Sequence, residues 1–439
     1  MHVDNKTRRD LEIFQTRDHG PGVFQGLDLT KTPGGSRALR TRFENPFSDP
    51  ARIREVQAGI QFLCEEKIQF FPDPALIGEV RRYIDSSWDV GTRARGLRFL
   101  IESIVVAIRY RDLLRDVMVG VAATRQLASR LIPFLRDILA KDPPPEIQSP
   151  VEELLGSVER LYSPLGKPHG SPWAVFRADR SLRLERKAEL QRSIDLLSEL
   201  DALIAMAAAT TECGFVLPEI VDGSAFVLAG EGVFHPALED AVGNPVRMSD
   251  QERLVFLTGP NMAGKTTYLR AVAIAAFLAH LGMGVPASCF RISTLDSIYS
   301  SLSPEEDLRA GLSYFMAEVR RVRHIAEALA RGERAFVVID EVFRGTNVKD
   351  ALDASGMAIR GFARSRTGGF IVLSHLVELA DDLKALPEVR FAHFDGEIRE
   401  GLASYQFRLK DGVSNQRFGL VLLEQEGVPE LLDSLEARS

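Results

Sequence analysis

Apolar residues in the first half of the chain recur at the spacing of α-helices. From Leu97 to Ile108 they return at spacings of four, three and four residues, and further apolar residues prolong this stripe on one face of a helix towards Ala140. An unbroken helix of this length would extend over about 60 Å, and Pro133 is expected to kink or interrupt it. A second helical pattern runs from Leu190 to Ile204. We interpret both stripes as surfaces of a core in which helices pack on helices. The first stripe comprises Leu97, Ile101, Ile104, Ile108, Val117, Val121, Leu127, Leu131, Leu135 and Ile138.

The pattern changes after Gly214, where short β-branched and aromatic runs alternate with helical stretches. The runs Leu254–Thr258, Phe336–Ile339 and Phe370–Leu373 have no alternating polar positions. Such runs are typical of strands in a parallel sheet that helices cover on both faces. The sequence therefore predicts two domains: an all-helical domain over residues 1–213 and an α/β domain over residues 214–439.

A phosphate-binding loop is expected between the first of these strands and the next helix. The segment Gly259–Thr266 fits the pattern GxxxxGK[ST] at every fixed position. Glycines allow backbone N–H groups to close around phosphate oxygens, and the helix N-terminus adds partial positive charge. An ordinary glycine-rich turn is the alternative, but strand, motif and helix follow in the required order. We expect ATP to contact Gly259, Pro260, Asn261, Met262, Ala263, Gly264, Lys265, Thr266 and Thr267.

Within this loop, Lys265 is predicted to reach the β- and γ-phosphates, and the Thr266 hydroxyl to bind Mg²⁺. Asp340 and Glu341 end a second buried run. We expect Asp340 to hold Mg²⁺ through water, and Glu341 to orient and deprotonate the attacking water. An Asp-Glu pair can also be a solvated turn, although its place after a complete phosphate loop favours catalysis.

His375 follows the third buried run. Such a histidine is often a core or turn residue. In a parallel sheet, however, the carboxyl ends of the strands face the ligand. We therefore predict that His375 senses the γ-phosphate and forms part of the catalytic set.

Composition narrows the class of protein only slightly. The 439 residues contain 54 Lys and Arg against 61 Asp and Glu, so the net charge of −7 gives no overall attraction to nucleic acid. We interpret the three cysteines, Cys64, Cys213 and Cys289, as reduced core thiols of a cytoplasmic protein. The N-terminus lacks the apolar segment of a signal peptide. The apolar stretch Ala271–Ala287 is too short to cross a membrane.

Several motifs resemble those of the MutS family of DNA mismatch-repair ATPases. The loop with its Pro-Asn-Met insert is close to the family's form, and Asp307–Glu318 resembles its signature loop. Asp340–Thr346 resembles the family's Walker B strand and D-loop. Weaker similarities extend back to Thr7 and Leu29–Arg40, so the resemblance covers nearly the whole chain.

The resemblance implies a helical core and lever domain followed by a P-loop, ABC-like α/β ATPase domain. It also implies a homodimer with composite ATP sites, in which Ser313 of one subunit caps the γ-phosphate held by Lys265 of the other. ATP binding would then draw the ATPase domains together and move the levers.

The chain departs from the family in ways that bear on function. No Phe-x-Glu motif for mismatch reading is present, and the sequence between the lever helices is too short for a full DNA clamp. The aromatic residue that commonly stacks on adenine is replaced in the segment Ala241–Asn244. We therefore expect any DNA binding to select DNA structure instead of mismatches.

Three functions remain open at this point. The first is a DNA-associated ATPase in repair or recombination, for which residues 79–130 offer ten arginines against six acids. The same charges suit a solvated helical face. The second is an ATP-gated scaffold that binds a protein and has no DNA role. The third, an ABC or SMC-like head, would need a Ser-Gly-Gly-Gln signature that is absent near Ser313.

Overall fold

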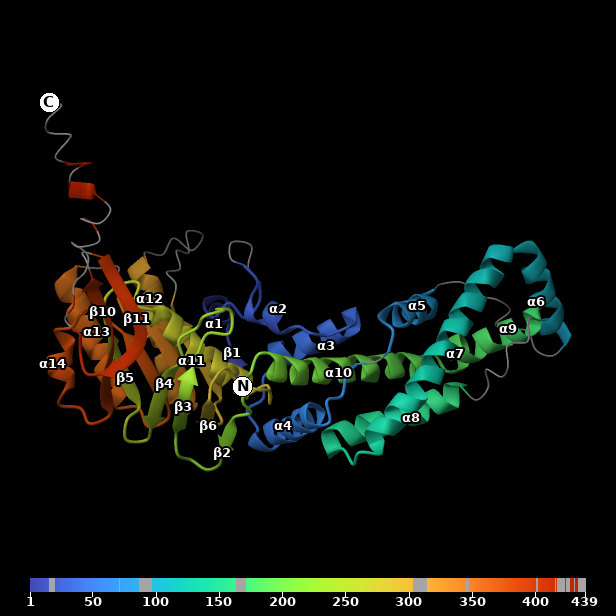
Figure 1. The fold of residues 1–439 in the computed structure, drawn as a ribbon, viewed down its shortest axis with the longest axis horizontal. Helices are drawn as coiled ribbons and strands as arrows, with labels where there is room; N and C mark the ends of the chain where they lie inside the picture. Colours follow the sequence, from blue (N-terminus) through green and yellow to red (C-terminus); the bar gives the residue numbers. More distant parts are fainter. Residues whose placement is uncertain are drawn as a thin grey trace. The chain divides into compact units, whose positions relative to one another are not determined.

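The computed structural model describes residues 1–15, 20–70, 72–86, 97–162, 171–302, 314–343, 347–399 and 402–414, together with 416, 423, 427–429 and 431–432. Two compact units make up the chain (Figure 1). One comprises Asp28–Glu44 and Glu55–Ala209, and the other comprises Met1–Leu27, Asn45–Arg54 and Thr210–Ser439. The sequence-based division at residue 213 placed the whole N-terminal region with the helices. The structure instead groups its first residues with the α/β unit.

The first unit is built from helices alone within its described residues. Asp201 of α10 is buried and accepts hydrogen bonds from the Thr32 N–H at 2.9 Å, the Thr32 hydroxyl at 2.7 Å and the Lys31 N–H at 3.0 Å. This carboxylate therefore fixes the start of α3 to α10. The helices are α3 (Pro33–Glu44), α4 (Pro50–Glu65), α5 (Pro74–Asp85), α6 (Leu97–Arg109), α7 (Arg111–Leu139), α8 (Pro145–Tyr162), α9 (Pro172–Arg180), a π-helical turn (Ser181–Glu185) and α10 (Lys187–Glu212).

The expected long rod is in fact two helices. Tyr110 leaves the helical conformation between α6 and α7, whereas α7 runs through Pro133 as one helix. The turn at Tyr110 brings Phe99 of α6 and Val117 of α7 into one apolar cluster with Phe176 of α9. Burial of these side chains in a shared cluster favours the turn over a continuous rod.

The apolar stripe that the sequence predicted to be buried lies on the exposed face of α6. Ile101, Ile104 and Ile108 are exposed, with Ile108 70 % accessible, while Phe99 and Ala107 are buried. Apolar residues cover α6 except for one stripe with Arg98, Glu102 and Arg109, so spacing alone could not decide which apolar side faces the core.

The second unit contains a seven-stranded sheet in the order β1-β7-β8-β9-β5-β10-β11 and a four-stranded sheet in the order β2-β6-β3-β4. The seven-stranded sheet is parallel except for the hairpin of β10 and β11. Its strands are β1 (His2–Val3), β5 (Leu254–Thr258), β7 (Ser297–Ser301), β8 (Ala335–Asp340), β9 (Gly369–Leu373), β10 (Val389–Arg399) and β11 (Leu402–Asp411). The smaller sheet has β2 (Glu219–Val221), β3 (Val227–Val233), β4 (Asn244–Ser249) and β6 (Cys289–Ser293).

Helices cover both faces of the larger sheet, as its all-apolar strands require. Phe256, Val337 and Phe370 belong to a cluster that includes residues of α12 (Tyr314–Ala330), α13 (Val348–Ala363) and α14 (Leu379–Leu383). The alternate residues of β5, Val255 and Leu257, are buried as well. The helix after the phosphate loop, α11 (Lys265–Ala279), packs against β8 and β9 and against β3 of the smaller sheet.

The N-terminal residues join this unit through main-chain and charged contacts. β1 pairs in parallel with β7 at the sheet edge, before α1 (Asn5–Asp10) and α2 (Val23–Leu27). Arg321 of α12 forms an ion pair with Asp4 and donates to the Thr7 hydroxyl at 2.9 Å. These bonds explain why residues assigned to the helical domain by sequence belong with the sheet.

The structure also bears on the predictions for the cysteines and for membrane-spanning helices. Cys213 and Cys289 are exposed and Cys64 is partly buried, so the interpretation of all three as core thiols is wrong. Among the described residues, no helix combines the length and apolar character needed to cross a membrane.

His280, just after α11, should make the α/β unit sensitive to acid. Its Nδ1 donates to the Ala276 carbonyl at 2.7 Å, and its Nε2 accepts from the Leu295 N–H at 2.8 Å. Burial lowers the pKa of His280 from 6.5 to about 4, so the unfolded chain takes up the proton first. The free energy of unfolding is therefore expected to fall as pH drops from 6.5 towards 4, by about 3 kcal/mol in total.

Denaturant unfolding of the unaltered chain and of His280→Gln at pH 7 and pH 4.5 measures this contribution. The variant is expected to lose about 2–3 kcal/mol less stability between the two pH values. Other buried groups, such as His235, contribute equally to both proteins and cancel in the difference. An identical loss in both proteins would contradict this assignment.

Candidate active site

The phosphate loop connects β5 to α11 through backbone conformations that glycine favours. Gly259 has φ +136° and Gly264 has φ +89°. A Cβ on Gly259 would lie 2.5 Å from the Phe394 carbonyl oxygen, so only glycine fits beside β10. Met262 also has a positive φ of +67° and a 71 % exposed side chain, which leaves it at the outside of the loop. The segment Gly259–Lys265 therefore adopts a turn whose glycines have positive φ, between the end of β5 and the start of α11.

Lys265 lies inside this loop. Its ammonium group donates to the carbonyls of Gly259 and Pro260, each at 2.7 Å, and the residue is buried. Phosphate oxygens placed at the N-terminus of α11 would meet both this charge and the N–H groups of the first helical turn.

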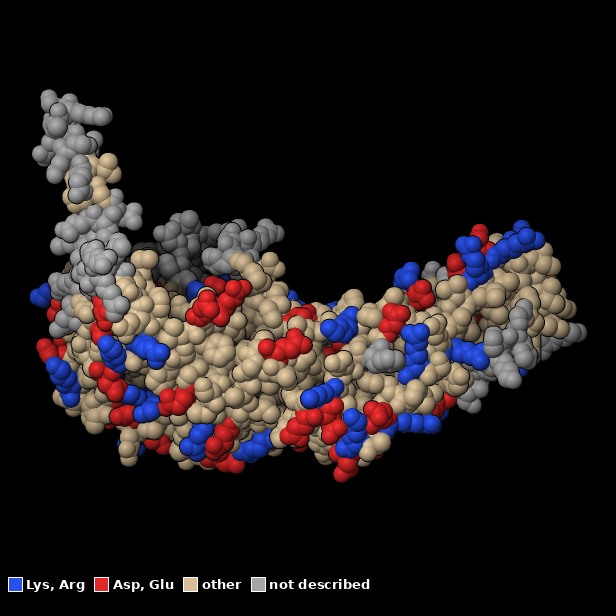
Figure 2. Space-filling model, viewed as in Figure 1, with Lys and Arg blue, Asp and Glu red and all other residues tan. Residues whose placement is uncertain are grey.

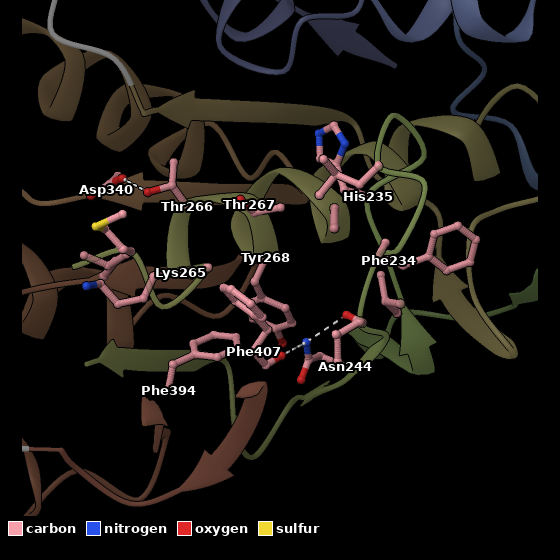
Figure 3. A pocket seen from close by; sticks show the side chains of 18 of the residues that line it. Phe234, His235, Asn244, Lys265, Thr266, Thr267, Tyr268, Asp340, Phe394 and Phe407 are labelled. Atoms are coloured by element: carbon pink, nitrogen blue, oxygen red, sulfur yellow. Dashed lines mark hydrogen bonds between the residues drawn. The ribbon is translucent and has the colours of Figure 1, made fainter. Parts of the chain in front are cut away.

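Thr266 and Asp340 meet at the carboxyl edge of the sheet. The Thr266 hydroxyl donates to Asp340 Oδ2 at 2.6 Å, although 74 residues separate them (Figure 3). A hydroxyl and a carboxylate are hard oxygen ligands of the kind that Mg²⁺ takes in small number beside phosphates and water. This donor pair thus fits the magnesium ion expected from the sequence.

Glu341 and His375 form the next contact along the same edge. His375 Nε2 lies 2.8 Å from Glu341 Oε1, and both side chains remain partly accessible. The Glu341 N–H donates to the Leu373 carbonyl at 3.0 Å, which ties the end of β8 to β9. Adjacent parallel strands therefore bring together the predicted base and the predicted γ-phosphate sensor.

These side chains open onto a cavity of about 640 Å³. Lys265, Thr266, Thr267 and Asp340 line one part of it, and Phe234, His235 and Asn244 line another (Figure 3). Burial, followed by the charge of Arg270, lowers the pKa of His235. The imidazole is therefore neutral near pH 7 and can contact a ligand by hydrogen bonding.

Phe407 of β11 contributes an aromatic ring to this cavity. Its backbone is left-handed, with φ +53°, and its side chain is 42 % exposed. A Cβ on Gly264 would lie 3.1 Å from the Phe407 ring, so the ring sits directly beside the phosphate loop. This places a flat apolar surface where a nucleotide base could stack.

Asn244 holds Phe407 in place. The buried Asn244 amide donates to the carbonyls of Phe407 at 2.9 Å and Val242 at 3.1 Å, and its oxygen accepts from the Leu409 N–H at 2.7 Å. These bonds connect the edge of the smaller sheet to β11. They offset the unfavourable backbone conformation at Phe407.

Comparisons with known proteins identify the family of this chain. Residues 6–161 match the model of MutS domain III, and residues 255–437 match that of MutS domain V. The chain belongs to the MutS family. Its fold class is confirmed: a helical domain III followed by a domain V α/β ATPase.

Two MutS relatives show how far the similarity extends. The DNA mismatch repair protein MutS of Oleidesulfovibrio alaskensis is 25 % identical over 567 aligned residues, covering 100 % of this chain and 62 % of the relative. DNA mismatch repair protein MutS 1 of Halobacterium salinarum is 34 % identical over 263 residues, covering 58 % of this chain and 29 % of the relative. The chain thus spans less than two thirds of the length of these MutS proteins.

Ser313, predicted to reach a partner's ATP, lies outside the described residues, as does the D-loop segment 344–346. Phe407 is the site residue that the sequence did not suggest. The MutS motif places a base-stacking aromatic just before Asn244, where this chain has no aromatic residue. No local motif marks Phe407, because hairpin pairing between β10 and β11 decides its position.

Proposed function

We propose that this MutS-family chain binds ATP with Mg²⁺, hydrolyses it at a site completed by a second copy, and couples the cycle to DNA binding in repair or recombination. MutS domain V is an ATPase domain, which supports the catalytic part. The observation that carries the proposal is the meeting of Lys265, Thr266, Asp340 and Glu341 around one cavity.

Each of these residues has a distinct part in the proposed reaction. Lys265 neutralises charge on the β- and γ-phosphates as the terminal bond breaks. Thr266 and Asp340 would hold Mg²⁺, which would supply further positive charge to the phosphate oxygens. Glu341 accepts the proton of the attacking water, and His375, 2.8 Å away, orients that carboxylate.

Exposed apolar side chains close to the site support a homodimer. Met262 of the loop is 71 % exposed, Val348 at the start of α13 is 78 % exposed, and Met316 near the start of α12 is 42 % exposed. Apolar groups of this size favour contact with another protein surface. A second copy that covers them would bring its own Ser313 towards the γ-phosphate.

Phe407 is proposed to stack on the base of the nucleotide. Phe407→Ala is expected to weaken ATP binding about 5- to 100-fold, since base–aromatic stacking is worth about 1–3 kcal/mol. Turnover at saturating ATP should change little, because the phosphate end of the site stays intact. Steady-state KM and kcat separate the two effects.

Tyr405→Ala provides the matched control for Phe407→Ala. Tyr405 lies on the same strand and its ring is 6.2 Å from that of Phe407, yet it does not line the cavity. An equal rise in KM for both variants would show that the loss comes from disturbance of β11 and not from the base contact.

Salt dependence tests the DNA part of the proposal. Binding of the dimer to duplex and branched DNA is expected to weaken at least ~10-fold between 50 and 200 mM salt, the effect of about two phosphate contacts. The affinity should also differ between ATP and ADP. Fluorescence anisotropy with labelled DNA measures both effects. Absence of binding to linear, mismatched and branched DNA with either nucleotide would leave the coupling to DNA without support.

The surface of the helical unit favours the alternative, a scaffold that binds a protein. Arg98 pairs with Glu102 at 2.9 Å and Arg136 with Glu159 at 2.7 Å. Figure 2 shows basic and acidic side chains interspersed over the drawn face. Beside the first of these pairs, α6 exposes Ile101, Ile104, Val105 and Ile108. Paired charges beside an apolar stripe suit a protein surface better than a phosphate backbone.

A further inference from the structure

The backbone just after the Walker B strand holds two side chains in an unfavourable conformation. Glu341 has φ +57° and Phe343 has φ +62°. Bulky side chains rarely adopt this left-handed region, and such residues persist only where the surroundings hold them. Two of them within three residues, one being the proposed catalytic base, require contacts that stabilise this turn.

Among the described residues, hydrogen bonds hold the first part of the turn. The Glu341 N–H donates to the Leu373 carbonyl of β9 at 3.0 Å. The Val342 carbonyl accepts from the buried hydroxyl of Ser355 in α13 at 2.7 Å. Phe343 is instead held by its ring, which is buried in the apolar cluster beneath α12 and α13.

The ring of Phe343 contacts the ring of Phe315. Their centroids are 5.5 Å apart and the planes are tilted by 52°, a favourable arrangement for aromatic pairs. Phe315 is the second residue of α12, and Ser313 precedes that helix by one residue. A shift at the start of α12 would therefore press on Phe343, two residues from Glu341.

We propose that Phe343 is a positioning residue that links the start of α12 to the carboxylate of Glu341. The link rests on the proposed function, in which α12 follows the loop that acts in the partner's ATP site. Engagement of that loop would change the position of α12, and the Phe315–Phe343 contact would transmit the change to the base of the same subunit.

A double-mutant cycle tests the link. Phe343→Leu and Phe315→Leu keep an apolar side chain but remove the ring contact. Each is expected to lower kcat on the order of 10-fold with an unchanged KM for ATP, because small misplacement of a catalytic group slows chemistry without weakening binding. The double variant should be no slower than either single variant, since both remove one contact.

Phe362→Leu is the matched control. Phe362 stacks on Phe370 with centroids 5.0 Å apart in the same apolar cluster, away from the end of β8. It should lower the melting temperature while kcat stays within twofold of the unaltered chain. Phe315 is only partly buried, so its variant tests the link even if Phe343→Leu does not fold.

Two results would overturn the link. One is kcat values for Phe315→Leu and Phe343→Leu that match Phe362→Leu. The other is multiplication of the two single effects in the double variant, which would mean that the rings act separately. Glu341→Gln in the same assay distinguishes failure of the link from failure of the proposed function. Unaltered turnover in that variant would refute the proposed function itself.

Discussion

Glu341→Gln is expected to slow ATP hydrolysis by about 10²–10⁴-fold, the usual cost of losing a general base. Glutamine keeps the size of the side chain and one oxygen that can orient water, but it cannot accept a proton at neutral pH. The contact with His375 Nε2 at 2.8 Å can persist through the amide oxygen. ATP binding should therefore remain close to that of the unaltered chain.

Single-turnover phosphate release and binding of a fluorescent ATP analogue measure the two properties separately. Glu378→Gln is the matched control, because Glu378 is exposed, lies three residues after His375 and does not line the cavity. Hydrolysis at the normal rate by Glu341→Gln would assign the base to another residue. A parallel loss in Glu378→Gln would point to a general effect of charge removal.

Lys265→Ala is expected to weaken ATP binding, the step that precedes hydrolysis. A hydrogen bond from a charged group contributes about 1.5–3 kcal/mol, so ATP affinity is expected to fall about 10- to 100-fold. Transition-state charge on the phosphates would lose further stabilisation, which lowers kcat by roughly another 10²-fold. The variant also removes the two bonds to Gly259 and Pro260 that hold the loop closed.

Lys384→Ala provides the control for Lys265→Ala. Lys384 is an exposed lysine paired with Asp381 at 2.7 Å and does not line the cavity. Isothermal titration with ATP and Mg²⁺ is the measurement. If Lys265→Ala bound ATP as tightly as Lys384→Ala, the assignment of the phosphate loop would be wrong.

Local sequence patterns were sufficient to predict the residues at the phosphate end of the site. The segment Gly259–Thr266 carries its chemistry within eight consecutive residues. Asp340, Glu341 and His375 each follow an apolar run that can only be a buried strand. Because parallel strands point their carboxyl ends to one edge, residues from separate motifs had to meet there.

Long-range contacts decided the rest. The sequence could not show that Phe407 enters the cavity, because hairpin pairing and the hydrogen bond from the Asn244 amide to the Phe407 carbonyl place it beside Gly264. Nor could it show that residues 2–3 add a strand to the ATPase sheet. In α6, apolar residues cover most of the helix. Periodicity therefore predicted a buried face with Ile101 and Ile108, whereas the fold buries Phe99 and Ala107.

By itself, then, the sequence determined the family and the two-part fold. It also predicted the residues that we propose to handle phosphate, since each lies in a run of adjacent positions or at one strand end. Only the tertiary structure decided that Phe407 lines the cavity, that residues 2–3 pair with β7, and that Phe315 contacts Phe343. These features join residues that are far apart in the chain. Their free energy comes from packing and hydrogen bonds that exist only once the sheet and its helices have formed.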